Sequence, residues 1–346
     1  MANKVNALHV LMIAPELSSF VMRDYDILRK YFKVTLLRYG GRRYLLNYVF
    51  NLFKHAGEAD LIICWFLGLH SLLASLIAKA LRRKVISIMG GYEVAYLPNV
   101  GYGWLGSPFR RVVLKLAFSL TDITLAVDNS LKRRALEYGL IKRDKIIVVP
   151  TGYDPGKFKP SGAKEDIVLT VAFISKATLR RKGLITFVKA ASYLPDVKFV
   201  VAGGILEPEA LRELKRIAPP NVTFTGYLSE EELIRLYQRA KVYCQLSLHE
   251  GLPNALCEAM LCGCVPVGTK VGGIPNAIGD CGFYVPKEDV KATVKAIKLA
   301  LNSQKGDEAR RRIIKFFNLR RRELSLLLII TELLKGRHPV AGCPSS

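Results

Sequence analysis

The chain has 346 residues, half of them hydrophobic, which suits two domains of ordinary size and excludes an intrinsically disordered protein. Lys and Arg outnumber Asp and Glu by 52 to 29, so the formal net charge is +23. An anionic partner is therefore expected: a nucleotide, a phosphorylated substrate, a nucleic acid or an anionic lipid. The seven cysteines lack a disulfide or zinc-knuckle spacing and indicate buried thiols in a reducing cytoplasm. No signal-peptide pattern opens the sequence, and we expect a cytoplasmic protein.

The first half of the chain alternates short apolar runs with helical patterns. Near-continuous Val, Ile and Leu runs are typical of parallel strands that are covered on both faces. Alternation with helices indicates βαβ units and a doubly wound sheet. The strand candidates are 7–14, 33–39, 60–66, 84–90, 122–128 and 145–152, and helical patterns cover 107–121 and 130–139.

One uncharged segment, 61–78, reaches the length at which a membrane span is considered. It contains Gly68 together with histidine and serine residues, and its neighbours repeat the strand–helix rhythm. We therefore interpret it as a buried strand, a turn at Gly68 and a helix over 69–82.

The rhythm stops around 151–165, where Gly, Pro and Lys dominate, and then resumes. The pattern predicts an α/β protein with two Rossmann-like domains. Ligands of such sheets bind outside the carboxyl ends of the strands, and a cleft between two facing domains is the default site. The predicted parts are an N-terminal domain over 1–152, a linker over 153–165, a C-terminal domain over 166–318 and a terminal segment over 319–346. The segment 287–335 is expected to be helical throughout.

Two acids flank a strand–helix junction in "SLHEGLPNALCEAM", residues 247–260. Glu250 would sit at the carboxyl end of a strand, and Glu258 would share a helix face with Asn254 because the two are four residues apart. Pro253 suits a helix start, whose amides could hold a phosphate. The spacing is equally compatible with a solvated helix acid and a first-turn partner of the helix dipole.

The segment "SKATLRRKGL", residues 175–184, places Lys176 after a strand and Lys182 before a helix. Lysine at a helix start opposes the helix dipole, so it needs another reason, and a diphosphate ligand would supply one. A solvated basic loop is the alternative, which we prefer for Arg180 and Arg181.

Two further strand ends carry glycines. "TGYL" contains Gly226 and Tyr227, and "MGGYE" contains Gly90, Gly91 and Glu93. Such glycines permit close backbone approach, and Glu93 could act on an acceptor, although a plain turn explains the pattern equally well. The chain has no G-x-G-x-x-G and no Walker lysine motif, which argues against nicotinamide and P-loop enzymes.

The thirty residues "HEGLPNALCEAMLCGCVPVGTKVGGIPNAI" resemble the donor-site signature of the retaining glycosyltransferases of family four, which have the GT-B fold. "VPTGYDPGKFKP" is similar to the linker of these enzymes, and "ISKATLRRKGL" to their Gly-Arg…Lys-Gly segment. The resemblance implies two Rossmann-like domains with a terminal helix that crosses back to the first. It implies a retaining transfer from a nucleotide-diphosphate sugar to a glycan, lipid or small-molecule acceptor.

Carried over residue by residue, the resemblance implies that Glu250 contacts the transferred sugar. Lys176 and Lys182 would neutralise the diphosphate in place of a bound metal, and Glu258 would hold the ribose hydroxyls. No cofactor is implied. The remaining donor-binding residues would be Gly251, Leu252, Pro253, Asn254, Gly226 and Tyr227.

The sequence departs from the family pattern at several points. "APELSSF" replaces the Gly-rich loop after the first strand, and "MGGYE" stands where a His is usual. Lys176 replaces Arg and loses its bidentate fork, and Asn276 replaces a common Glu. These departures motivate a second hypothesis, a non-catalytic GT-B protein that binds nucleotide sugars or tethers to membranes. A nucleic-acid-binding role has only the net charge in its favour.

The densest basic run, 310–322, interleaves Arg clusters with Ile and Phe. One interpretation is an amphipathic segment on an anionic membrane, which would make the protein peripheral to the inner membrane face. The other is a terminal helix packed on the domains with solvated arginines, which we prefer for 323–335.

Overall fold

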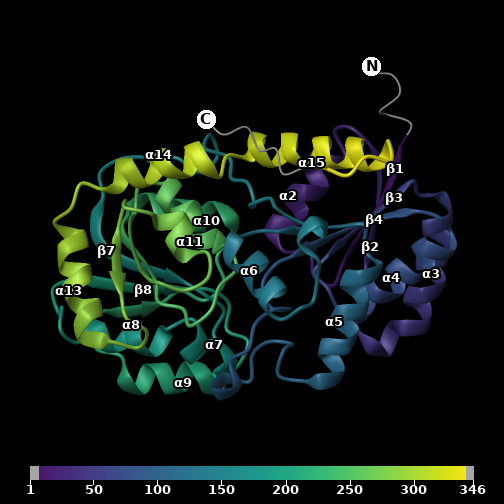
Figure 1. Ribbon diagram of the computed structural model, residues 1–346. Helices are drawn as coiled ribbons and strands as arrows, with labels where there is room; N and C mark the ends of the chain where they lie inside the picture. The colour runs from purple at the N-terminus through teal and green to yellow at the C-terminus, as the bar shows by residue number, and fades with distance from the viewer. Residues whose placement is uncertain (1–7, 340–346) are drawn as a thin grey trace. The chain divides into compact units, whose positions relative to one another are not determined.

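The computed structural model describes residues 8–339, and contacts divide the chain into two compact units (Figure 1). The first unit contains the chain up to Tyr96, then Gly103–Gly152, and then the segment that begins at Leu319. The second contains Leu97–Tyr102 and Tyr153–Asn318. The predicted linker residues thus cluster with the second unit. The helix after Leu319 clusters with the first, and the last seven residues of the predicted terminal segment lie outside the described range.

The described part of the first unit contains a six-stranded parallel sheet. Its strands are β1 (His9–Ala14), β2 (Lys33–Arg38), β3 (Leu61–Trp65), β4 (Lys84–Met89), β5 (Ile123–Ala126) and β6 (Ile146–Val148). The strand order is β2-β1-β3-β4-β5-β6. The residues of β1, β3 and β5 are all buried, as expected for strands covered on both faces.

Helices cover both faces of this sheet. They are α2 (Ser19–Leu28), α3 (Leu45–Glu58), α4 (Leu69–Ala80), α5 (Pro108–Leu120), α6 (Asn129–Glu137) and α15 (Leu319–Leu334), with short 3₁₀ turns at Arg42–Tyr44, Pro98–Val100 and Arg143–Lys145. The connection from β1 to β2 runs in the opposite direction to the later ones. Because such crossovers are right-handed, α2 lies on one face and α3, α4 and α5 on the other. Helices α3 and α4 bury one side against β1 and β3.

Helix α15 is fixed to α2 by a buried ion pair. The guanidinium of Arg322 donates to both carboxylate oxygens of Asp24, at 3.0 and 2.6 Å, and to the carbonyl of Val149. Both side chains are almost fully buried, and the indole of Trp65 also donates to Asp24, at 3.1 Å. Arg322 is therefore an internal residue of the first unit.

The described part of the second unit contains another six-stranded parallel sheet. Its strands are β7 (Glu165–Val171), β8 (Lys198–Ala202), β9 (Val222–Phe224), β10 (Ala240–Gln245), β11 (Val265–Thr269) and β12 (Phe283–Val285). The helices are α7 (Lys176–Arg181), α8 (Leu184–Ala191), α9 (Pro208–Ile217), α10 (Glu230–Arg239), α11 (Asn254–Leu261), α12 (Ile274–Ile278), α13 (Val290–Leu301) and α14 (Gly306–Phe316).

The strand order of this sheet, β12-β11-β10-β7-β8-β9, contains a topological switch point. From β7 the chain adds β8 and β9 on one side, and then returns to add β10, β11 and β12 on the other. The direction reverses between β7 and β10. Doubly wound sheets bind ligands outside the carboxyl ends of the strands at such a point.

The predicted α/β architecture with two doubly wound sheets is confirmed. Segment 61–78 forms β3, a turn and the start of α4, as predicted, and no helix among the described residues is long and apolar enough to cross a membrane. The prediction of continuous helix over 287–335 is wrong. That segment forms α13, α14 and α15, with breaks at 302–305 and 317–318.

Candidate functional site

The switch point of the second unit brings together two segments that the sequence singled out. Helix α7 follows β7, and residues 246–253 followed by α11 continue from β10. Because β7 and β10 are parallel neighbours, their carboxyl ends lie at the same edge of the sheet. Lys182, at the end of α7, and Glu250, in the loop before α11, meet there.

The carboxylate of Glu250 is buried and receives three donors on one oxygen. Its Oε1 accepts from Lys182 Nζ at 2.6 Å, from Gln245 Nε2 at 2.9 Å and from Ser247 Oγ at 2.6 Å. Burial alone would raise the pKa of this carboxyl, but the charges of Lys182 and Arg181 and the hydrogen bonds outweigh it and lower the pKa. Glu250 is thus held as an anion beside cations, and it is not a solvated surface acid.

Lys176 lies elsewhere in the same segment. It is the first residue of α7, whereas Lys182 caps the other end, so about 9 Å of helix separates their backbones. The side chain of Lys176 is exposed, and its backbone N–H donates to Glu207 Oε2 at 3.0 Å. The structure therefore brings Lys182, and not Lys176, into contact with Glu250.

The Lys-Gly pair has a packing reason. Gly183 adopts a left-handed φ of +70° at the start of α8, and a Cβ there would collide with the carbonyl of Leu246. Gly272 has a φ of +52°, and a Cβ there would collide with the carbonyl of Glu250. The next residue, Gly273, donates its N–H to the carbonyl of Gly251 at 2.8 Å. These glycines let the loops after β7 and β11 clamp the loop that carries Glu250.

Helix α11 carries the second acid of the motif. Glu258 is buried, and the hydroxyl of Tyr237 donates to its Oε2 at 3.4 Å. One turn earlier, Asn254 Oδ1 accepts from the hydroxyl of Tyr153 at 2.8 Å. Helix α11 begins at Asn254, with Pro253 as its N-cap. Proline has no N–H, so the amides that a helix start offers here are those of residues 254–256, and the assignment of an amide to Pro253 is wrong.

The other predicted donor contacts line neighbouring strand ends. Gly226, after β9, has a φ of +72° and accepts at its carbonyl from the N–H of Gly203 at 3.0 Å. Tyr227 is 78% exposed, the most open large aromatic among the described residues of this unit. Leu252 is buried, and Gly251 is half-buried.

In the first unit, Glu93 organises two strand exits. Its Oε1 accepts from the backbone N–H of Leu67 and of Gly90, both at 3.2 Å, and its Oε2 accepts from Gly91 at 2.7 Å. The side chain is buried, and desolvation raises its pKa in spite of these bonds. The geometry makes Glu93 a structural link between the loops after β3 and β4. Contact between this group and an acceptor stays a prediction.

Sequence reasoning missed several partners of Glu250. Arg181, expected in a solvated loop, is half-buried, and its guanidinium carbon lies 4.4 Å from the ring centroid of Tyr102. Tyr102 belongs to the segment that clusters with the second unit, and its ring also lies near His249. Gln245 and Ser247 were missed because the end of a buried strand gives no polar signal. Arg180 fits the expectation better, because it is exposed and pairs with Glu288.

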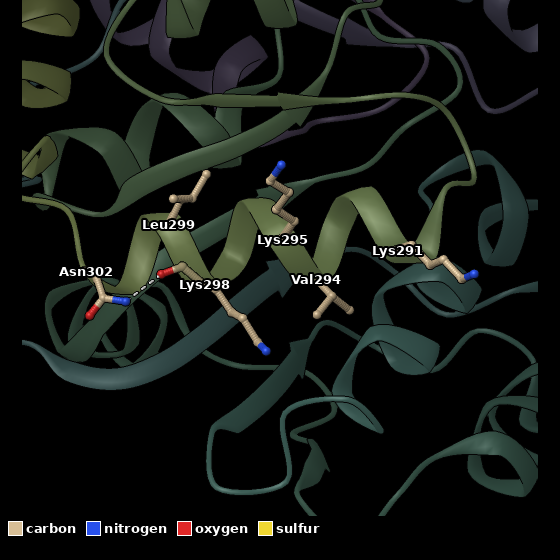
Figure 2. A pocket seen from close by; sticks show the side chains of 6 residues that line it. All are labelled: Lys291, Val294, Lys295, Lys298, Leu299 and Asn302. Carbon is tan, nitrogen blue, oxygen red and sulfur yellow. Dashed lines mark hydrogen bonds between the residues drawn. The ribbon is translucent and has the colours of Figure 1, made fainter.

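No group of three or more His, Cys, Asp or Glu side chains within residues 8–339 is placed to hold a metal ion. A hollow of about 360 Å³ lies away from the strand ends, along the outer side of α13 (Figure 2). Three lysines line it together with Val294, Leu299 and Asn302, and all six residues come from α13 or the position after it. One helix surface does not form a substrate cleft, so we assign it no function.

Two family models match consecutive parts of the chain. Residues 6–157 match Glycosyltransferase Family 4, and residues 158–317 match Glycosyl transferases group 1. The two models together span both units and the switch-point site. The chain belongs to the group 1 and family 4 glycosyltransferases, which have the GT-B fold.

Curated relatives support this family. A phosphatidylinositol N-acetylglucosaminyltransferase of Arabidopsis thaliana is 25% identical over 220 residues, 61% of this chain and 49% of that protein. The serotype-specific mannosyltransferase WbdA of Escherichia coli is 27% identical over 227 residues, 58% of this chain and 27% of that protein. The chain thus spans half or less of these relatives.

Solved structures show the same fold. HepE of Anabaena in complex with UDP superposes with a TM-score of 0.79 at 16% identity, covering 94% of this chain and 100% of that chain. Sucrose-phosphate synthase of Thermosynechococcus elongatus superposes with a TM-score of 0.79 at 18% identity, covering 95% and 100%. At these identities the likeness establishes the fold alone.

Proposed function

We propose that this protein transfers a sugar from a nucleotide-diphosphate sugar to an acceptor, with retention of anomeric configuration and without a bound metal. The observation that carries the proposal is the Lys182–Glu250 pair at the switch point of the donor-type sheet. A cation and a carboxylate held together at this edge suit a ligand with both a diphosphate and sugar hydroxyls.

Lys182 and Arg181 supply positive charge at the point where the leaving group develops negative charge. The N-terminus of α8 adds the positive end of its dipole next to Lys182. As the bond from the anomeric carbon to the diphosphate oxygen breaks, the electron pair leaves with the oxygen. Preorganised cations then stabilise the transition state more than the ground state. Lys176 would reach a more distant phosphate oxygen from the start of α7.

The two glutamates divide the donor between them. Because all three donors to Glu250 reach Oε1, Oε2 is the oxygen that a sugar hydroxyl would meet. Glu258, on α11, would accept from the ribose hydroxyls. The base would lie toward Gly226 and Tyr227, whose exposed ring offers a stacking surface. The structural neighbour HepE was solved in complex with UDP, which supports a nucleotide donor for this chain as well.

The acceptor would be a glycan or a lipid-linked glycan. The named activities of the relatives, on phosphatidylinositol and in serotype-specific mannosyl transfer, support this class. The proposal also places the protein in the cytoplasm. The described cysteines are all free thiols, which agrees with a reducing compartment.

The test is turnover of UDP-, GDP- and ADP-sugars against a panel of glycan and lipid acceptors, in the presence and absence of EDTA. We expect one donor to be consumed, with EDTA having no effect and with the product's anomeric configuration, read by NMR coupling constants, matching the donor's. Glu250→Gln and Lys182→Ala should lower turnover, while Lys295→Ala on α13 should not. Full activity in both site variants would refute the site. Donor binding without transfer to any acceptor would favour the non-catalytic alternative.

A further inference from the structure

Helix α3 of the first unit exposes an apolar row to solvent. Leu46, Phe50 and Phe53 are 87, 71 and 60% exposed. They are spaced four and three residues apart, so they lie on one side of the helix. The opposite side buries Tyr48, Leu52 and Ala56 against the sheet. The core already accounts for that side, so the outer row has no partner within the described fold.

A second apolar row lies on α5. Phe109, Val112 and Leu116 are 67, 57 and 48% exposed, again along one side, while Val113, Leu114, Ala117 and Phe118 are buried. Helix α4 packs against both α3 and α5, and Leu76 on its outer surface is 48% exposed (Figure 1). All three helices cover the same face of the sheet. We call these seven exposed residues the α3–α5 face.

The charges around the α3–α5 face are nearly all positive. The exposed basic residues on or beside the three helices are Arg43, Lys54, Lys79, Arg110, Arg111 and Lys115. Helices α4 and α5 contain no acid, and the only acid of α3 is Glu58 at its last position. A large exposed apolar surface with a basic rim marks an interaction site. The partner must offer apolar and anionic groups together.

We propose that the first unit rests on an anionic membrane through the α3–α5 face. Exposed Phe and Leu side chains enter the boundary between headgroups and acyl chains, while Lys and Arg meet the headgroup phosphates. A second copy of this chain is a poorer partner, because a symmetric contact would set the same basic residues against one another. A nucleic acid has no use for the phenylalanines. The proposal concerns the surface alone and holds whether or not the protein transfers sugar.

This assignment replaces the basic run 310–322 as the membrane-binding element. In that run, Arg310 donates to the carbonyls of Phe158, Leu261 and Pro155, and Arg312 donates to those of Asn276 and Ala277. Arg322 is buried in the first unit. Arginines that hold backbone carbonyls are not presented to lipid headgroups, so the interpretation of the run as a membrane-lying helix loses its charges.

The test is cosedimentation of the full chain with vesicles of phosphatidylcholine alone or with 30% phosphatidylglycerol. We expect binding to the anionic vesicles that is at least tenfold tighter than to the neutral ones and weakens in 0.5 M NaCl. Phe50→Ser with Phe53→Ser should weaken binding at least tenfold, and Arg110→Ser with Lys115→Ser should reduce the preference for anionic vesicles. These side chains are exposed, so thermal melting should confirm that the variants remain folded.

The matched control is Leu299→Ser with Lys295→Ser on α13, which removes one exposed apolar and one basic residue from the second unit and should leave vesicle binding unchanged. Three results would overturn the proposal. The wild type could stay in the supernatant with both vesicles, or the Phe50 and Phe53 variant could bind as the wild type does. In the third, the chain could form a dimer, seen by light scattering, that the same variant dissociates, which would assign the face to a second copy.

Discussion

Lys182 Nζ lies 2.6 Å from Glu250 Oε1, and the two residues come from turns that follow different strands of the sheet. Their side chains are 22% and 10% exposed. Pairing keeps the carboxylate charged in a buried place and at the same time positions a cation at the switch point. The pair therefore serves both the fold and the proposed chemistry, and variants of it should separate the two.

Lys182→Ala should lower both stability and turnover. Removing one member of a buried pair costs about 3–5 kcal/mol, and we expect the lower end because Gln245 and Ser247 still donate to Glu250. Turnover should fall about 10²–10³-fold if Lys182 stabilises the leaving diphosphate as a positioned oxyanion donor does.

The double variant Lys182→Ala with Glu250→Gln separates these effects. It leaves no unpaired charge, so it should regain part of the lost free energy of unfolding without regaining turnover. Urea unfolding and initial rates measure the two quantities. If activity returned together with stability, Lys182 would have only a structural role.

The pH dependence of stability should reveal Glu250. Its pKa in the folded protein lies below its ordinary value, so the folded state favours the charged form. That contribution is complete above the unfolded pKa, about 4.3, and is lost as the pH falls through the lower folded pKa. Urea unfolding between pH 6 and pH 3 should therefore show a smaller acid loss in Glu250→Gln than in the wild type. The exposed Glu213→Gln is the control and should follow the wild type.

The strand–helix rhythm made the architecture predictable, because each buried strand of a parallel sheet is a nearly continuous apolar run. The thirty-residue motif located Glu250 and Glu258 for the same reason that the structure needs its glycines. Gly272 and Gly183 are fixed by close approach of the loops, and a pattern of glycines survives in the sequence.

Other features could not be predicted because they depend on contacts between residues distant in the chain. Arg322 looked like part of a solvated basic run, but its partner Asp24 is 298 positions away. The breaks that divide 287–335 into three helices lack a proline, and only the packing of α14 and α15 on different units reveals them. Exposure of the apolar rows on α3 and α5 also required the fold, because each helix is apolar on two sides.

Glu93→Gln should test whether that residue acts on the fold or on an acceptor. Glutamine keeps one carbonyl oxygen, but its NH₂ group would face one of the three backbone N–H groups that the carboxylate now accepts. A lost bond with a buried donor left unpaired costs about 1–3 kcal/mol. We expect that loss in urea unfolding, with the KM for the donor unchanged. An unchanged free energy of unfolding together with a raised KM for the acceptor would instead make Glu93 an acceptor residue.

Two glycines of the second unit form a matched pair. Gly272→Ala adds a Cβ that collides with the carbonyl of Glu250, in addition to the strain of a φ of +52°. Gly226→Ala meets nothing within 4 Å and carries only the strain of a φ of +72°. The second variant should lose about 1–2 kcal/mol, as expected for a left-handed residue that gains a Cβ, and the first clearly more. Thermal shift with and without donor should show that Gly272→Ala loses the ligand response as well, because the loop bearing Glu250 must move.

The last prediction concerns the helix at the end of the described chain. Arg322→Leu would leave Asp24 as a buried carboxylate without its ion-pair partner, which should cost about 3–5 kcal/mol. The loss should be reported by Trp65, whose indole donates to Asp24 and lies under the guanidinium, so its fluorescence should change in the folded state as well as on unfolding. Adding Asp24→Asn removes the buried charge and should recover part of the stability. Arg311→Leu, an exposed arginine of the same basic run, is the control and should change stability by less than about 0.5 kcal/mol. Equal losses in the two single variants would mean that the run acts through its total charge, and the assignment of Arg322 to the core of the first unit would be wrong.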